Sequence, residues 1–294
     1  MGYQKNDKTK EDENFVCDAA LQNFFEDENY VYYWDCVKDE YMTLKELADE
    51  KGALLIICHV LRYSNYYRKI KEIISSGVIG DIVSINHTEN VGYFHFAHSF
   101  VRGNWRDEFT STPSILAKCC HDLDLISWFV DSPCVSVSSV GEVGHFKKEN
   151  APTGATPYCM GGCKAKKNCP YDAEALYITD PFYKAKFIKY MGRTLTGKLK
   201  NSKADIVNAV KTGDYGRCVY MCDNNVCDHM SILMEFEDGI TATFSLTAQT
   251  SDVHRDIHIM CEHGEIHGDE LDGSIRVSHF RRNKQEPEQS RTLQ

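Results

Sequence analysis

Lys118 and His121 stand three residues apart in the stretch Ile115–Phe129. Side chains at this spacing are neighbours on the surface of a helix. An imidazole with an ordinary pKa of about 6.5 can accept or give a proton near neutral pH, and an ammonium group can stabilise a developing alkoxide. The pair therefore predicts proton exchange with an alcohol or a carbonyl compound, with His121 as acid or base and Lys118 as the polarising group. The alternative is a surface lysine beside a core histidine.

Further histidines are candidate ligand contacts. His95 and His98 lie three apart in a loop rich in aromatic residues. We expect them to contact the substrate; plain packing and a metal site are the alternatives. His229 follows Asp228 in a segment with strand character, and neighbouring side chains on a strand face opposite ways. Only one of these two residues can then face a pocket, and we take His229 as the candidate.

Three cysteines suggest a metal site. Cys159, Cys163 and Cys169 fall within eleven residues, and lysines lie between them. Three thiolates can bind one tetrahedral Zn²⁺, and nearby lysines favour the thiolate form. The candidates for a fourth ligand are Cys218, Cys222 and His145. The sequence thus predicts a structural zinc site, with reduced free thiols and an iron–sulfur site as alternatives.

The composition limits the classes of partner. The chain has 294 residues, a net charge of −10 and a hydrophobic fraction of 42%. An acidic chain repels nucleic acid and anionic membranes, so we expect neither as a partner. No segment approaches the roughly 20 apolar residues of a membrane span, and the N-terminus lacks the apolar core of a signal peptide. The cysteine count of 13 is odd, which disfavours a disulfide scaffold and favours a cytoplasmic protein.

Apolar periodicity predicts the elements that carry these residues. The stretch 115–129 reads as one amphipathic helix, because its apolar residues recur at steps of three and four. Two further helices are expected at 43–51 and 64–76. The continuous apolar run 53–58 reads as a buried strand of an α/β unit. Shorter helices are expected at 16–25, 172–178 and 182–190.

Strand patterns dominate the second half of the chain. Segments with strand character are joined by tight turns, which indicates antiparallel pairing. The fold class is therefore α+β, with an open, mostly antiparallel sheet backed by helices. Strands are expected at 30–34, 81–87, 134–143, 217–221, 229–236, 241–247, 255–261 and 274–280.

Several motifs together resemble the Gfo/Idh/MocA oxidoreductases, a family that includes glucose-fructose oxidoreductase and inositol dehydrogenase. The resemblance covers roughly residues 41–280. The segments that carry it are Ala53–Cys58, Arg62-Tyr63, Gly77–Asp81, Asn104-Trp105-Arg106, Cys120–Leu125 and Gly264–Asp269.

The resemblance implies an oxidoreductase that uses NAD or NADP and acts on a hydroxyl of a sugar, cyclitol or sugar derivative. The family's conserved histidine matches His121, and Lys118 replaces the polar role of an aspartate that many members carry at the position of Ala117. Trp105 and Arg106 are then expected near the cofactor, and Arg62 near the substrate. Members often pair through the sheet, so we expect a homodimer or higher homo-oligomer.

The chain departs from the family at its N-terminal end. It contains no Gly-x-Gly-x-x-Gly and no Glu-Lys-Pro, and a pyrophosphate needs such a turn and the helix behind it. We therefore expect an acidic segment with a truncated α/β Rossmann remnant over 1–58, a substrate and oligomerisation domain over 59–280 with a cysteine-rich insert at 145–200, and a polar tail over 281–294. Binding of NAD(P) by this chain alone is expected to be weak or absent. The alternatives are a catalytically inactive fragment that keeps the dimerising domain and an NAD-dependent glycosidase.

Overall fold

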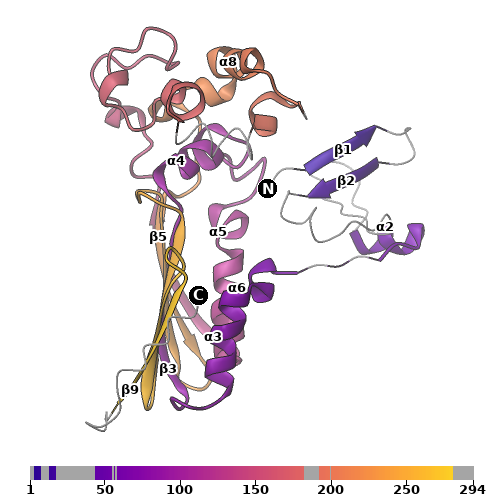
Figure 1. The fold of residues 1–294 in the computed structure, drawn as a ribbon, viewed down its shortest axis with the longest axis vertical. Coiled ribbons are helices and arrows are strands. Elements are labelled where there is room, and N and C mark those ends of the chain that lie inside the picture. Colours follow the sequence, from indigo (N-terminus) through magenta and orange to yellow (C-terminus); the bar gives the residue numbers. More distant parts are fainter. Residues whose placement is uncertain are drawn as a thin grey trace.

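A computed structural model describes residues 3–7, 13–17, 44–54, 56, 58–181, 192–198 and 200–280. An open seven-stranded sheet forms the centre, with helices along one face and a cap of loops and short helices beyond one end (Figure 1). Near the N-terminus, β1 (Tyr3–Asp7) and β2 (Glu13–Cys17) pair as a separate antiparallel hairpin. Helix α2 (Leu44–Lys51) follows, as the sequence predicted.

The large sheet has the order β4-β5-β6-β3-β7-β8-β9. Only β3 and β6 run parallel; the other neighbours are antiparallel. The prediction of an α+β fold with an open, mostly antiparallel sheet is therefore confirmed. The strands are β3 (Ile82–Asn90), β4 (Cys134–Glu142), β5 (His229–Phe236), β6 (Thr241–Thr247), β7 (His254–Cys261), β8 (Gly264–Asp269) and β9 (Ser274–His279).

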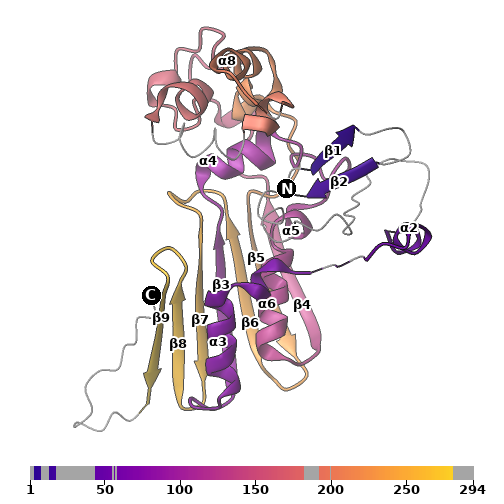
Figure 2. The same ribbon diagram turned by 45° about the vertical axis from the view of Figure 1, so that its right-hand side comes forward.

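Helices α3 (Asn65–Ser75) and α6 (Cys120–Val130) cover one face of the sheet (Figure 2). Helix α3 begins where predicted, because the Ser64 hydroxyl accepts a hydrogen bond from the Tyr66 amide and so satisfies one free donor of the first turn. Strands β5 and β7 alternate buried and more exposed residues. The buried residues meet the helices, and the opposite face of the sheet carries no helix (Figures 1 and 2).

The helix expected over 115–129 is interrupted. Helix α5 (Ser114–Ala117) ends at Lys118, and α6 begins after Cys119. Lys118 has φ −121° and ψ −48°, outside the helical range. The single-helix prediction was wrong, because apolar spacing reports the buried stripe and does not reveal a local break.

The cap lies beyond the end of the sheet where β3 leads into α4 (Tyr93–Phe96) (Figure 1). Its buried side chains form a second, smaller core that includes Tyr177, Ile206 and Val210. The remaining elements are mostly short: 3₁₀ turns at Val60–Tyr63, Lys148–Asn150, Lys166–Asn168, Asp214–Gly216 and Val219–Met221, π-helical turns at Ala97–Arg102 and Ala175–Thr179, and helix α8 (Lys203–Thr212).

Two expected strands are not found. Leu54 and Ile56 are exposed, and the described part of 53–58 contributes no strand to the large sheet. A buried strand needs cover on both faces, which this segment lacks. The segment 217–221 makes a single bridge from Arg217 to Tyr158 and then turns as a 3₁₀ helix. Conversely, β8 was not predicted as a strand.

Several predicted elements fall on parts of the chain outside the described residues. These are the strand at 30–34, the helix at 182–190 and the tail 281–294. The helix expected at 16–25 is only partly covered. Its first residues, Val16 and Cys17, belong to strand β2 instead.

Candidate active site

Two completely buried carboxylates, Glu89 on β3 and Asp122 on α6, lie at the centre of the candidate site. The Glu89 oxygens lie 2.9 Å from Lys118 Nζ and 2.7 Å from Arg255 Nη2. The Asp122 carboxylate accepts from Arg255 Nε at 2.7 Å and contacts His87 Nε2 at 2.8 Å. Two anions thus meet two cations, as buried charges require. The network joins the α5–α6 junction to β3 and β7.

Hydrogen bonding keeps Asp122 ionised despite its burial. Burial alone would raise the pKa of this carboxyl, but the hydrogen bond with His87 and the charge of Arg255 lower it below its usual range. Asp122 is therefore an anchor for α6 rather than a proton donor.

His121 follows this anchor on the first turn of α6 and is partly buried. Its Nδ1 is buried and has no hydrogen-bond partner. Burial, followed by the charge of Arg255, lowers the pKa of its imidazole below 6.5, and Lys118 acts in the same direction. The ring is therefore neutral at neutral pH and able to accept a proton. The charge of Lys118 thus still acts on His121, although the break between α5 and α6 separates the two residues.

His59 stands beside His121, with ring centroids 5.8 Å apart. One ligand atom each of His59, Cys120 and His121 lies within 4.8 Å of the others. Imidazole and thiolate are donors that suit zinc, so these three residues could hold a metal ion. An imidazole nitrogen that binds a metal cannot also take a substrate proton, so the two uses exclude each other at that atom.

Arg62 is engaged by a carboxylate within the chain. Its guanidinium makes two bonds of 2.7 Å to Asp124 and lies over the Trp128 ring at 5.5 Å. The bidentate pair ties the turn before α3 to α6. A substrate contact from Arg62 requires competition with Asp124.

The two loop histidines have different surroundings. His95 is partly buried, and burial followed by the charge of Lys118 holds its pKa well below 6.5. This places His95 near the Lys118 end of the site. His98 is buried, and its Nδ1 shares a hydrogen bond of 2.9 Å with the Tyr177 hydroxyl. Its ring stacks on that of Tyr215, with the ring centroids 4.6 Å apart. A substrate cannot reach His98 without displacing these rings.

The expected cofactor contacts also have partners within the chain. Arg106 Nε lies 3.1 Å from Asp223, and Nη1 lies 3.5 Å from Asp214. Trp105 packs against the main core. Neither residue forms part of the network around Glu89.

His229 lies on the other face of the sheet. His229 on β5 pairs with Thr247 on β6, and Thr247 pairs with Asn90 on β3, so the three side chains lie on the same face. Glu89, next to Asn90 on β3, must point the opposite way, so His229 cannot join Lys118. The expectation that Asp228 and His229 point apart was also wrong, because Asp228 precedes β5 and its carboxylate contacts His229 Nδ1 at 2.6 Å.

The cysteines predicted to bind zinc do come together. Cys159, Cys163 and Cys169 line one small cavity, and Cys218 joins them from a distant part of the chain. The eleven cysteines in the described part of the chain are all free thiols.

Sequence reasoning missed the buried network. His87, Glu89 and Arg255 occupy inward positions of β3 and β7, where the neighbouring inward residues are apolar. Polar residues in register with an apolar stripe were the available signal, because a buried charge requires a partner.

The fold and the network together define an α+β domain that presents a lysine and a neutral histidine beside a buried ion-pair cluster. The sequence matches the model of the "Oxidoreductase family, C-terminal alpha/beta domain" over residues 71–291. The chain belongs to the Gfo/Idh/MocA oxidoreductase family.

Individual relatives match over shorter stretches. The chain is 28% identical over 139 residues to YteT of Bacillus subtilis (strain 168), a provisionally named oxidoreductase, covering 46% of this chain and 32% of YteT. It is 37% identical over 87 residues to the scyllo-inositol 2-dehydrogenase (NADP(+)) IolW of the same strain, covering 29% of this chain and 23% of IolW. Among solved structures, a levoglucosan dehydrogenase complex with NADH and levoglucosan matches with a TM-score of 0.49 at 12% identity, over 85% of this chain and 50% of that one.

The chain therefore matches a third or less of these curated relatives. Within the described part of the chain, every helix is too short or too polar to span a bilayer.

Proposed function

We propose that this chain handles the substrate in an NAD(P)-dependent oxidoreductase that acts on a hydroxyl of a sugar, cyclitol or sugar derivative. One observation carries the proposal: Lys118 and His121 flank a helix break that a buried network anchors to the sheet. The network fixes Lys118 through Glu89 and places His121 next to the anchored Asp122. Side chains that are already held in position lose little conformational freedom when a substrate binds.

In the oxidation direction, the substrate hydroxyl gives its proton to the neutral His121 ring. Lys118 donates a hydrogen bond to the same oxygen and stabilises the negative charge that develops there. Glu89 and Arg255 keep the Lys118 ammonium in position. A nicotinamide cofactor beside the substrate carbon would supply the hydride acceptor.

The described residues do not form a site that fits the dinucleotide. Arg106, the expected phosphate contact, is held by Asp223 and Asp214. The sequence has no Gly-rich turn at which a pyrophosphate could meet a helix N-terminus. We therefore derive no step that depends on how the cofactor is held.

The sheet face without helices is the proposed homodimer surface. Leu233 on β5 and Val140 on β4 are exposed there, among serine and threonine side chains. Val140 pairs with Ser231, the outward residue two before Leu233, so both lie on the same face. The free thiols support a cytoplasmic location, where such cysteines stay reduced.

The test is turnover of the purified chain with NAD⁺ or NADP⁺ and a panel of cyclitols and aldoses, read as absorbance of the reduced nicotinamide. We expect oxidation of at least one polyol, but only at high cofactor concentrations, because the described residues form no site that fits the dinucleotide. Replacing His121 with Asn should lower kcat by roughly 10²–10⁴-fold. The matched control is His263→Asn, because His263 is exposed in the β7–β8 turn, and it should keep full activity.

Two other results would reject the proposal. Release of a chromophore from an aryl glycoside, without net change in reduced nicotinamide, would identify a glycosidase. A folded protein that shows neither turnover nor a change in NADH fluorescence would identify an inactive chain.

A further inference from the structure

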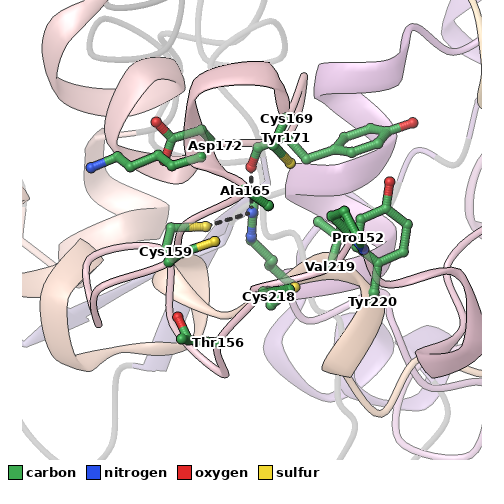
Figure 3. A pocket seen from close by; sticks show the side chains of 14 residues that line it. Pro152, Thr156, Cys159, Ala165, Cys169, Tyr171, Asp172, Cys218, Val219 and Tyr220 are labelled. Atoms are coloured by element: carbon green, nitrogen blue, oxygen red, sulfur yellow. Dashed lines mark hydrogen bonds between the residues drawn. The ribbon is translucent and has the colours of Figure 1, made fainter.

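Four cysteines from separate turns of the cap surround one cavity. Cys159, Cys163 and Cys169 come from the insert, and Cys218 comes from the segment before β5. The labelled side chains of Cys159, Cys169 and Cys218 lie around this space in Figure 3. The cavity volume is about 10 Å³, which is close to the space of a single water. It suits one ion and is too small for an organic ligand.

Arg102 lines the same cavity and is completely buried. Its Nε donates to the Arg217 carbonyl at 2.8 Å, and its Nη2 donates to the Tyr171 carbonyl at 2.6 Å. Nη2 also lies 3.7 Å from Cys159 Sγ, and the Tyr177 hydroxyl is a further hydrogen-bond partner of the guanidinium. These partners are carbonyls, a thiol and a phenol, so none of them carries a full negative charge.

A buried guanidinium without an anion is costly, because a charge loses its hydration and gains no opposite charge in return. The groups that line the cavity and can carry a negative charge are the four thiols and the buried carboxyl group of Asp172. A bound metal ion would remove the thiol protons and leave thiolates beside Arg102.

We infer that Cys159, Cys163, Cys169 and Cys218 bind one structural zinc ion, and that Arg102 compensates the negative charge of the resulting tetrathiolate. Four thiols release four protons, and Zn²⁺ with four thiolates carries a charge of −2. The Arg102 guanidinium reduces the local charge to −1. The insert alone supplies three ligands, and the fold supplies the fourth from Cys218.

The side chains must close around the ion. No three of these four sulfurs lie within 4.8 Å of one another. Zinc–sulfur bonds of about 2.3 Å in a tetrahedron place the sulfurs about 3.8 Å apart.

The position of the site gives the metal a structural role. The second core in the cap contains only eight buried apolar residues in the described part of the chain, and Cys159 is one of them. A core of this size contributes little hydrophobic stabilisation, so an additional link would strengthen it. A zinc ion would join the insert to the Cys218 segment and so fix the cap on the end of the sheet.

The test measures zinc in the full chain purified without added metal, by elemental analysis. We expect about one equivalent of zinc, and loss of most of it in Cys163→Ser and Cys218→Ser. Cys222→Ser is the matched control, since Cys222 is four residues from Cys218 and does not line the cavity. Cys120→Ser controls for one of the two other groups that could hold a metal ion, His59, Cys120 and His121. Both controls should keep the zinc.

Cobalt substitution reports the ligand set independently of the variants. The chain with Co²⁺ in place of zinc should show the strong visible absorption of a tetrahedral tetrathiolate. Thiol titration of the wild-type chain should find four additional reactive cysteines after a chelator removes the metal. The inference fails if the chain holds less than a tenth of an equivalent of zinc, if iron and sulfide are present instead, or if Cys120→Ser loses the zinc and Cys218→Ser retains it.

Discussion

The ammonium nitrogen of Lys118 lies 2.9 Å from the carboxylate of Glu89, which is completely buried. Lys118 stands at the end of α5, where the chain leaves the helical conformation. The interruption thus coincides with an ion pair from the helix layer to the sheet. Because Arg255 shares the same carboxylate, one buried anion positions two cations.

Replacing Glu89 with Gln should destabilise the protein. Loss of this anion removes the carboxylate that Lys118 pairs with and leaves Arg255 with Asp122 and Glu270, and breaking a buried ion pair costs about 3 kcal/mol. Urea unfolding should show this decrease in the free energy of unfolding. The control is Glu72→Gln, which breaks an exposed pair with Lys69 and should change stability by roughly 0.5 kcal/mol or less. Equal effects of the two changes would contradict the network.

The buried His98 ring predicts a loss of stability in acid. Burial, followed by the charge of Arg102, lowers the pKa of His98 from 6.5 to about 3. The unfolded chain therefore binds a proton at this residue below pH 6.5, and the folded chain does not. Stability falls as the pH drops from 6.5 towards 3, by about 2 kcal/mol per group between pH 6.5 and 5.

The measurement for His98 is the free energy of unfolding at several pH values. The His98→Gln variant keeps a group that can hydrogen-bond Tyr177 and cannot titrate in this range. Its free energy of unfolding should decline less between pH 6.5 and 5 than that of the wild type. If the pH dependence of the free energy of unfolding were the same in both, His98 would be protonated in the folded protein.

The large sheet could be predicted from the sequence because its strands alternate strictly. Strands β5, β6 and β7 were placed to within one residue, since one face packs on the core. Other elements lacked such a signal. The segment Ala53–Cys58 is as apolar as a buried strand, but burial depends on neighbours that the sequence does not reveal. Helix α8 was missed although Ser202 and Asp205 form a capping box at its start.

The candidate site was predictable in part. Lys118 and His121 are neighbours through short-range spacing, which the sequence contains. Glu89 and Arg255 are distant in sequence and meet only because β3 and β7 pair. Cys218 meets the insert because the neighbouring Arg217 forms a bridge with Tyr158. These contacts depend on which distant segments pair and in which register. The apolar periodicity of the sequence does not specify either.

A charged residue introduced on the sheet face without helices should prevent the proposed homodimer. Leu233 is 54% exposed at the centre of β5, and an aspartate there would have to be desolvated on association. Leu233→Asp should therefore be monomeric by sedimentation or light scattering. Leu271→Asp changes a similarly exposed leucine in the β8–β9 turn and should stay dimeric. A monomeric wild type would refute the dimer.

The central claim is that His121 takes the substrate proton beside Lys118. Its most direct test is the pH dependence of kcat/KM for NAD(P)-linked polyol oxidation by the wild type and by Lys118→Met. Since burial and nearby cations lower the pKa of His121 below 6.5, activity should fall only at pH values under 6.5. Removing the Lys118 charge should move this fall to higher pH and lower kcat by roughly 10²–10³-fold. The claim would be contradicted if kcat/KM fell at the same pH in the wild type and in Lys118→Met. It would also be contradicted if the same pH dependence persisted in His121→Asn.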